Sequence, residues 1–239
     1  MNSNPANQYV HTTGEIIQRI ALLNGGKMPP KGLIKYIFED EILKNEQKYA
    51  LQESDVVVIE VSSIKQIQFG VYFLQLNRLI NETRGSMGKG KKFEDWMKKL
   101  RRLVKDGQKK EIRNRRISKN PEKVIHQLNT KLQDELDLER DLKKIVDSLD
   151  SKILLVSHIN IPKISGEMLR SRESLCEMLK SISHRLDVRL FDPTSLVKGK
   201  KRKVMLKKDG EDINHYSEFG EDEVGNMIHG EITELINNE

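Results

Sequence analysis

Three short apolar runs, separated by helix-forming sequence, constrain the fold of this chain more than any other feature. They occupy residues 56–61, 152–161 and 187–191. Each run is apolar along most of its length instead of alternating with polar residues, which is typical of strands buried on both faces of a parallel sheet. Strands that alternate with helices along a chain form parallel βαβ units. The sequence therefore predicts an α/β fold, with an open parallel sheet and flanking helices.

Helical patterns surround these runs. Residues 12–24 have apolar side chains at helical spacing, and Thr12 or Thr13 can cap the first turn. Further helices are predicted at residues 166–185 and 221–236, where apolar residues again recur every three or four positions.

A strongly basic segment follows the first apolar run. Residues 84–119 contain 15 Lys and Arg against four Asp and Glu, whereas the whole chain carries a net charge of +6. Apolar residues recur every three or four positions in 93–116 and in 121–148, which predicts two long helices with a narrow apolar stripe. In the simplest interpretation, the basic face is solvated and pairs with the acidic residues of 134–141.

These patterns divide the chain into two parts. Residues 84–149 are expected to form a basic helical-hairpin insertion at a crossover of the sheet. Residues 1–83 and 150–239 are expected to form the α/β domain that carries the insertion.

The composition restricts where the protein works. No stretch approaches the roughly 18 consecutive apolar residues of a membrane span, and the start of the chain lacks the basic and apolar regions of a signal peptide. The single cysteine, Cys176, excludes an internal disulfide and a cysteine-based zinc site. We expect a cytoplasmic protein without a metal or other cofactor, in which Cys176 belongs to the core.

The clearest indication of chemistry lies just before the last predicted helix. Asp212 and His215 are three residues apart in a turn-forming stretch. At this spacing the carboxylate can hold the imidazole in one tautomer, so that the imidazole can act as a general base for a hydroxyl nucleophile. In the alternative interpretation, Asp212 forms a turn and His215 caps the following helix.

Four segments resemble the SGNH/GDSL hydrolase superfamily, whose last conserved block is Asp-x-x-His before a final helix. They are residues 55–63, 152–162, 188–193 and 212–220. The resemblance implies a flavodoxin-like sheet and a serine-type esterase or acyltransferase, in which Asp212 and His215 complete a triad. It is closer to a divergent branch that is associated with bacterial surface polysaccharides, which implies an acylated carbohydrate as the substrate.

The nucleophile of that family is not found in its usual place. No Gly-Asp-Ser block precedes Val56, so either the α/β domain lacks its first strand together with the nucleophile, or the family's catalytic serine is absent. Ser62 and Ser63, at the carboxyl end of the first apolar run, can substitute as nucleophile or oxyanion donor, or can simply cap a helix.

Further polar residues follow predicted strand ends or begin helices, and these are candidates for binding the substrate. They are Lys65, His11, His158 and Asn160.

Two other functions compete with the enzyme. The basic insertion can serve a non-catalytic binding or assembly protein that associates with a protein partner or with itself. The 15 cations of residues 84–119 can also bind the phosphates of a nucleic acid.

Overall fold

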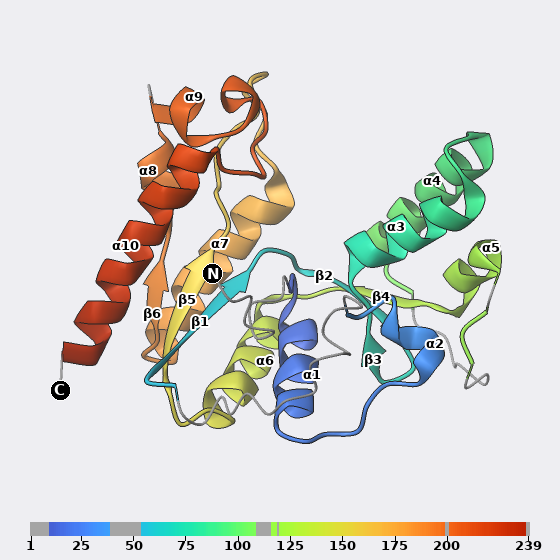
Figure 1. Ribbon diagram of the computed structural model, residues 1–239, viewed down its shortest axis with the longest axis horizontal. Helices are drawn as coiled ribbons and strands as arrows, with labels where there is room; N and C mark the ends of the chain where they lie inside the picture. Colours follow the sequence, from blue (N-terminus) through green and yellow to red (C-terminus); the bar gives the residue numbers. More distant parts are fainter. Residues whose placement is uncertain (1–9, 39–53, 109–115, 119, 199–200, 238–239) are drawn as a thin grey trace. The chain divides into compact units, whose positions relative to one another are not determined.

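The computed structural model describes residues 10–38, 54–108, 116–118, 120–198 and 201–237 (Figure 1). Its contacts group the chain into two compact units, which we describe separately. The antiparallel unit comprises Met1–Ala50 and Ile64–Asp141, and the parallel unit comprises Leu51–Ser63 and Leu142–Glu239. These boundaries do not coincide with the division at residues 84 and 149 that the sequence suggests.

The parallel unit contains a three-stranded sheet in the order β1-β5-β6. The strands are β1 (Val56–Val61), β5 (Lys152–Ser157) and β6 (Arg189–Phe191). β5 lies in the middle and pairs in parallel with both neighbours. The prediction that the three apolar runs form adjacent parallel strands is therefore confirmed.

Helices flank this sheet (Figure 1). α7 (Arg170–Arg185) contacts β5 and β6, whereas α10 (Glu218–Asn237) contacts β1 and β5. The short helices of the unit are α8 (Thr194–Val197), α9 (Arg202–Met205) and the 3-10 helix η6 (Lys208–Gly210). One apolar core joins the strands to the C-terminal helices through Leu154, Val156, Ile159, Phe191, Val197, Met205, Leu206, Ile213 and Val224.

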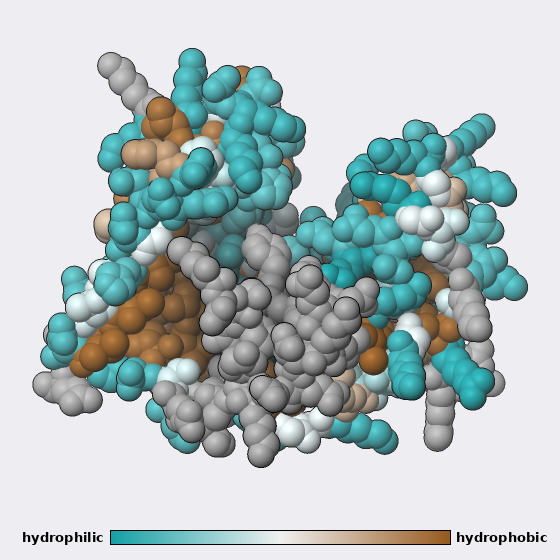
Figure 2. Space-filling model, viewed as in Figure 1, coloured by the Kyte–Doolittle hydropathy of each residue, from teal (hydrophilic) through white to brown (hydrophobic). Residues whose placement is uncertain are grey.

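Strand β1 is less buried than its sequence predicts. Val61 and Ile59 are buried, but Val58 is 41% exposed. Among the described residues, β1 pairs with β5 alone, so its other edge has no partner strand there. Figure 2 shows an apolar surface over β1 beside α10. An apolar run therefore predicts the strand here, but not burial on both of its faces.

The antiparallel unit has a sheet in the order β3-β2-β4. β2 (Lys65–Phe69) and β3 (Tyr72–Phe73) form a hairpin, and Gly70 has a φ of 61° in the turn, where a left-handed residue is required. β4 (Asn129–Leu132) pairs antiparallel with β2. The sequence analysis missed all three strands, which are only five, two and four residues long.

The antiparallel unit also contains helices. They are α1 (Thr13–Leu23), α2 (Lys31–Ile34), α3 (Leu76–Met87), α4 (Lys91–Asp106), α5 (Pro121–Val124), the 3-10 helix η4 (Ile125–Gln127) and the first half of α6 (Glu135–Asp147). Of these, α1 contacts β3, and α4 contacts β2 and β4. Thr12 caps α1 by accepting a hydrogen bond from the Glu15 N–H, as predicted. Throughout the described ranges, no helix is both long and apolar enough to cross a bilayer.

The prediction of a helical hairpin over residues 84–149 is wrong in its second half. Instead of one long helix, that half contains α5, η4, β4 and α6. Leu132 and Leu136 fit the apolar stripe in sequence, but they are 40% and 77% exposed in the structure. The pairing of β4 with β2, which helical spacing cannot reveal, ends the helix there.

Candidate functional site

The candidate site lies in the turn between η6 and α10 of the parallel unit. Lys208, Asp209 and Gly210 all have positive φ angles, of 53°, 52° and 88°. Left-handed backbone at non-glycine residues costs free energy and persists where the surrounding structure holds it. Here the Nε of Arg202 donates a hydrogen bond of 2.9 Å to the Gly210 carbonyl. The chain therefore enters the Asp212–His215 turn in a fixed, strained conformation.

Asp212 and His215 form the pair that their spacing predicts. His215 Nδ1 lies 2.9 Å from Asp212 Oδ2, and Asp212 Oδ1 accepts a hydrogen bond of 3.0 Å from the Asn214 N–H. The hydrogen bond with His215 is the main cause that lowers the pKa of Asp212 below its usual value. The His215 side chain is 63% exposed and that of Asp212 is 18% exposed, so a partly shielded carboxylate holds an accessible imidazole.

Arg172, near the start of α7, connects this turn to the end of β5. One guanidinium nitrogen donates to the Ile159 and Ile213 carbonyls, each at 3.0 Å, and the other donates to Asn214 Oδ1 at 2.6 Å. Ile159 follows β5 closely, since that strand ends at Ser157. The Asp212–His215 turn therefore lies beyond the carboxyl end of β5, where the sites of parallel sheets usually form.

The start of α10 closes the turn from the other side. Leu206 and Tyr216 form an isolated antiparallel bridge, and the Ser217 N–H donates 2.9 Å to the Met205 carbonyl. Gly220 packs directly on α9, because a Cβ atom there would lie 2.0 Å from the Met205 carbonyl oxygen. The Asp212–His215 pair, called the dyad below, is thus held between α9 and the first turn of α10.

Ser62 and Ser63 follow β1 at the same edge of the sheet. Val61 pairs with Ser157 of β5, so the two serines continue the chain beside His158 and Ile159. Both serines are half-buried. Their position at the carboxyl end of a strand agrees with the sequence analysis, while their distance to His215 and their role stay predictions.

His158 and Asn160 also lie at this edge, directly after β5. His158 Nδ1 is 3.5 Å from Glu60 Oε1, and the histidine side chain is only 11% exposed. The Asn160 N–H donates 3.0 Å to Thr194 Oγ1. Asn160 Oδ1 is buried and has no hydrogen-bond partner among the described residues. Of the two, Asn160 is therefore the better placed to receive a polar group of a ligand.

The remaining predicted binding residues belong to the antiparallel unit. Nε2 of His11 lies 3.1 Å from Nδ2 of Asn77. Lys65 is exposed at the start of β2, opposite Leu132 of β4. A substrate-binding role for these two side chains stays a prediction.

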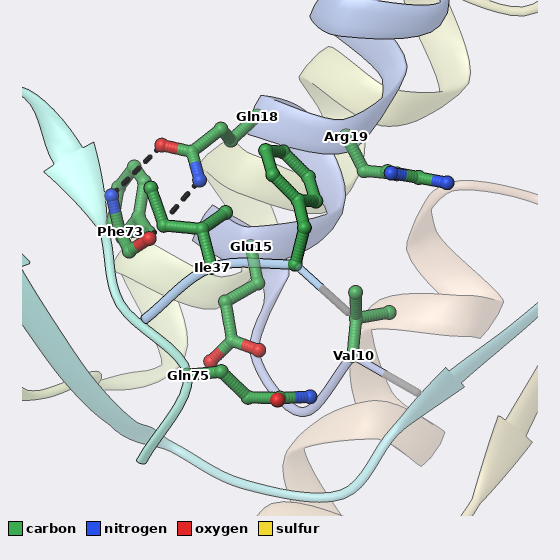
Figure 3. A pocket seen from close by; sticks show the side chains of 8 residues that line it. Val10, Glu15, Gln18, Arg19, Ile37, Phe73 and Gln75 are labelled. Carbon is green, nitrogen blue, oxygen red and sulfur yellow. Dashed lines mark hydrogen bonds between the residues drawn. The ribbon is translucent and has the colours of Figure 1, made fainter. Parts of the chain in front are cut away.

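A small recess at the start of α1 is a second polar site in the antiparallel unit (Figure 3). Glu15 and Arg19 of α1 line it together with Phe38 and Gln75. The Gln18 amide forms two hydrogen bonds with the Phe73 backbone, of 2.9 and 3.0 Å, and these attach α1 to β3. Burial raises the pKa of Glu15 to about 7, although the His11 N–H and the Thr12 hydroxyl donate to its carboxylate.

Two other sources of chemistry in proteins are a cysteine thiol and a group of metal ligands. Cys176 is buried, its Sγ lies 3.5 Å from the His158 carbonyl oxygen, and burial raises its pKa to about 11. A protonated, enclosed thiol is a poor nucleophile. Within the described ranges, no three His, Cys, Asp or Glu side chains form a group that could hold a metal ion.

The sequence analysis missed the residues that position the dyad. Arg172, Asn214 and Thr194 act through contacts that span 13 to 42 residues along the chain. Of these three residues, only Asn214 could have been singled out from the sequence. It lies inside the Asp-x-x-His segment, where its side-chain oxygen can accept a hydrogen bond from a nearby cation. No local pattern distinguishes Arg172 from the neighbouring arginines of α7.

Comparison with known proteins places the chain in a family. The model of the TviD N-terminal domain matches residues 1–231. The chain belongs to the TviD N-terminal domain family. A curated relative, the Vi polysaccharide biosynthesis protein TviD of Salmonella typhi, is 26% identical over 241 residues. The match covers 96% of this chain but 28% of the relative, so the chain spans less than a third of that protein's length.

The structural comparison gave no further relationship, since no solved structure matches the chain. The relative's own name assigns that protein to the biosynthesis of the Vi polysaccharide.

Proposed function

We propose that this chain is an SGNH-like esterase or O-acyltransferase that acts on an acylated carbohydrate. The observation that carries the proposal is the 2.9 Å contact between Asp212 and His215 beyond the carboxyl end of β5. The polysaccharide biosynthesis protein among the relatives supports the choice of carbohydrate. The proposal includes a flavodoxin-like arrangement of the parallel unit, which the order β1-β5-β6 permits.

In this proposal His215 is the general base. It removes the proton from a serine hydroxyl, for which Ser62 and Ser63 are the candidates, while the serine oxygen attacks the acyl carbon of the ester. Asp212 orients the imidazole and stabilises the imidazolium that forms. The bond between the acyl carbon and the sugar oxygen then breaks, and the imidazolium gives its proton to that oxygen, so that the sugar leaves with a hydroxyl and the acyl group stays on the serine. Water, or a hydroxyl of a second sugar, takes up the acyl group in the last step.

The exposure of His215 suits a large substrate. Its ring is 63% exposed, so a sugar hydroxyl on a polymer can reach it without a deep pocket. Asn160 Oδ1, buried without a described partner, is placed to accept a hydrogen bond from a sugar hydroxyl.

The test is hydrolysis of a short-chain nitrophenyl ester by the wild type and by His215→Ala. We expect the variant to lose activity by about 100-fold or more, which is typical for the loss of a general base. Ser62→Ala and Ser63→Ala, made separately, should identify the nucleophile, because one of them should abolish the activity.

His229→Ala is the matched control. His229 is an exposed histidine within α10, and its replacement should leave the rate unchanged. Equal rates for the wild type and for His215→Ala would refute the catalytic role of the dyad.

A further inference from the structure

A second contact between an imidazole and a carboxylate lies at the carboxyl edge of the parallel sheet. His158 Nδ1 is 3.5 Å from Glu60 Oε1, and the two side chains are 11% and 36% exposed. Glu60 belongs to β1, whereas His158 directly follows β5. The contact therefore joins the ends of two neighbouring strands, and the reaction proposed above does not use it.

Glu60 and His158 lie on the face of the sheet that α10 covers. Side chains alternate along a strand, and paired residues of parallel strands point the same way. Leu154 and Val156 of β5 pack in one core with Val224 of α10. Val156 pairs with Glu60, so Glu60 shares this face. The contact with Glu60 places the imidazole of His158 on the same face.

The same alternation separates the two serines that follow β1, which ends at Val61. Ser62 is two residues beyond Glu60, so alternation assigns it to the face of α10. Ser63 is two residues beyond Val61 and is assigned to the opposite face. The register of the two strands makes Ser62 the neighbour of His158, and neighbouring strands lie about 4.8 Å apart. Ser62, and not Ser63, therefore belongs beside the Glu60–His158 pair.

The direction of α10 brings the dyad to the same face and edge. Nζ of Lys152, at the start of β5, donates a hydrogen bond of 2.8 Å to the Leu235 carbonyl near the end of α10. The end of α10 therefore lies at the amino edge of the sheet. Its start, three residues after His215, lies toward the carboxyl edge (Figure 1). Ser62 and His215 thus approach one edge from one face, as a proton transfer between them requires.

We propose that Ser62 is the nucleophile of the site and that the Glu60–His158 pair positions it. The inference rests on the proposed function and decides between the two serines that this function leaves open. The backbone pairing of β1 with β5 ends at Val61, and the Glu60–His158 contact links the strands at that point. It fixes the direction in which Ser62 leaves the sheet. Glu60 and His158 are positioning residues, because they act through the strand end and not on the ester.

The first test identifies the serine that reacts with diisopropyl fluorophosphate. The serine oxygen forms a bond to phosphorus, the fluoride leaves with the electron pair of its bond, and the serine proton passes through His215 to water. Peptide fragmentation in a mass spectrometer distinguishes Ser62 from Ser63. We expect the label on Ser62 in the wild type and much slower labelling in His215→Ala.

The outcomes of the labelling separate the two proposals. A label on Ser63 or on another serine, with ester hydrolysis that still needs His215, would overturn this inference and leave the role of the dyad in place. No labelled serine, together with no ester hydrolysis, would refute the proposed function and this inference with it.

The second test is Glu60→Ala, which removes the link between the strand ends. We expect kcat for a short-chain nitrophenyl ester to fall by about tenfold or more at an unchanged KM, because a displaced nucleophile slows the reaction without weakening substrate binding. His158→Gln should lower kcat to a similar extent. Glu60→Gln keeps an oxygen that can accept a hydrogen bond from the imidazole, so it should restore part of kcat.

The matched controls are Glu177→Ala and His184→Gln, which change exposed residues of α7. Both should keep the wild-type kcat, and every variant should keep the wild-type circular dichroism. If His158→Gln does not fold, Glu60→Ala decides the question, since Glu60 is the more exposed partner. An unchanged kcat in Glu60→Ala, or a loss that Glu60→Gln does not restore even in part, would overturn the positioning role.

Discussion

Glu15 is a carboxyl group that the fold encloses at the start of α1. It is 8% exposed, and its burial raises its pKa from 4.5 to about 7. A folded-state pKa above the unfolded value means that the native state binds the proton more tightly. The contribution of Glu15 to stability is therefore complete below pH 4.5 and is lost as the pH rises to about 7.

Glu15→Gln should remove this pH dependence, because an amide cannot ionise. We expect the variant to gain stability over the wild type as the pH rises, by at most about 3 kcal/mol above pH 7, and to gain little near pH 4.5. Urea unfolding of both proteins at these two pH values measures the difference. A difference that stays constant with pH would show that folding does not raise the pKa of Glu15.

Arg172 is the side chain that holds the Asp212–His215 turn. Arg172→Met removes its hydrogen bonds to Ile159, Ile213 and Asn214, at a cost of about 2 kcal/mol in stability. The contact with His215 keeps the pKa of Asp212 low, so the pKa of Asp212 should rise when the turn loosens. Carboxyl NMR titration measures this change independently of activity.

Two further variants test whether the effect on Asp212 is specific to the guanidinium of Arg172. Arg172→Lys keeps the charge but cannot reach three acceptors with planar geometry, so it should restore the pKa of Asp212 only in part. Arg185→Met, at the far end of α7, should leave the titration of Asp212 unchanged. An unchanged Asp212 titration in Arg172→Met would exclude the positioning role.

At the scale of elements, the contact between α9 and α10 decides where the dyad lies. Gly220→Ala should destabilise the protein by about 2 kcal/mol. The new Cβ would lie 2.0 Å from the Met205 carbonyl oxygen, so the backbone of α9 or of α10 would have to move away. Gly225→Ala, on the same helix, meets no atom within 4 Å and should stabilise the protein by about 1 kcal/mol. Denaturant unfolding compares the two, and equal effects would contradict the close packing.

Elements also differ in how much of them the sequence could predict. α7 and α10 follow their apolar periodicity closely, and both begin within four residues of the predicted start. Residues 121–148 have a similar period, yet they form a strand between short helices. The hydrogen bonds of β4 go to β2, more than 60 residues earlier, and local spacing contains no information about such a partner.

At the scale of the whole molecule, the order of the apolar runs does not define the compact units. β1 belongs to the parallel unit, and the chain enters the antiparallel unit three residues after β1 ends, at Ile64. α6 crosses the boundary in the middle of a helix, between Asp141 and Leu142. No break in composition marks either position, because both units need the same apolar residues to form a core.

The sequence by itself determined the features that depend on neighbouring residues: the existence of strands β1, β5 and β6, the cap of α1 at Thr12, and the pairing of Asp212 with His215. Each follows from side chains a few positions apart, whose geometry the backbone fixes locally. Only the tertiary structure decided which face of α4 is buried with Trp96, and that Arg172 reaches the turn of Asp212 and His215. Those outcomes depend on contacts between distant segments, which exist only once the chain has folded.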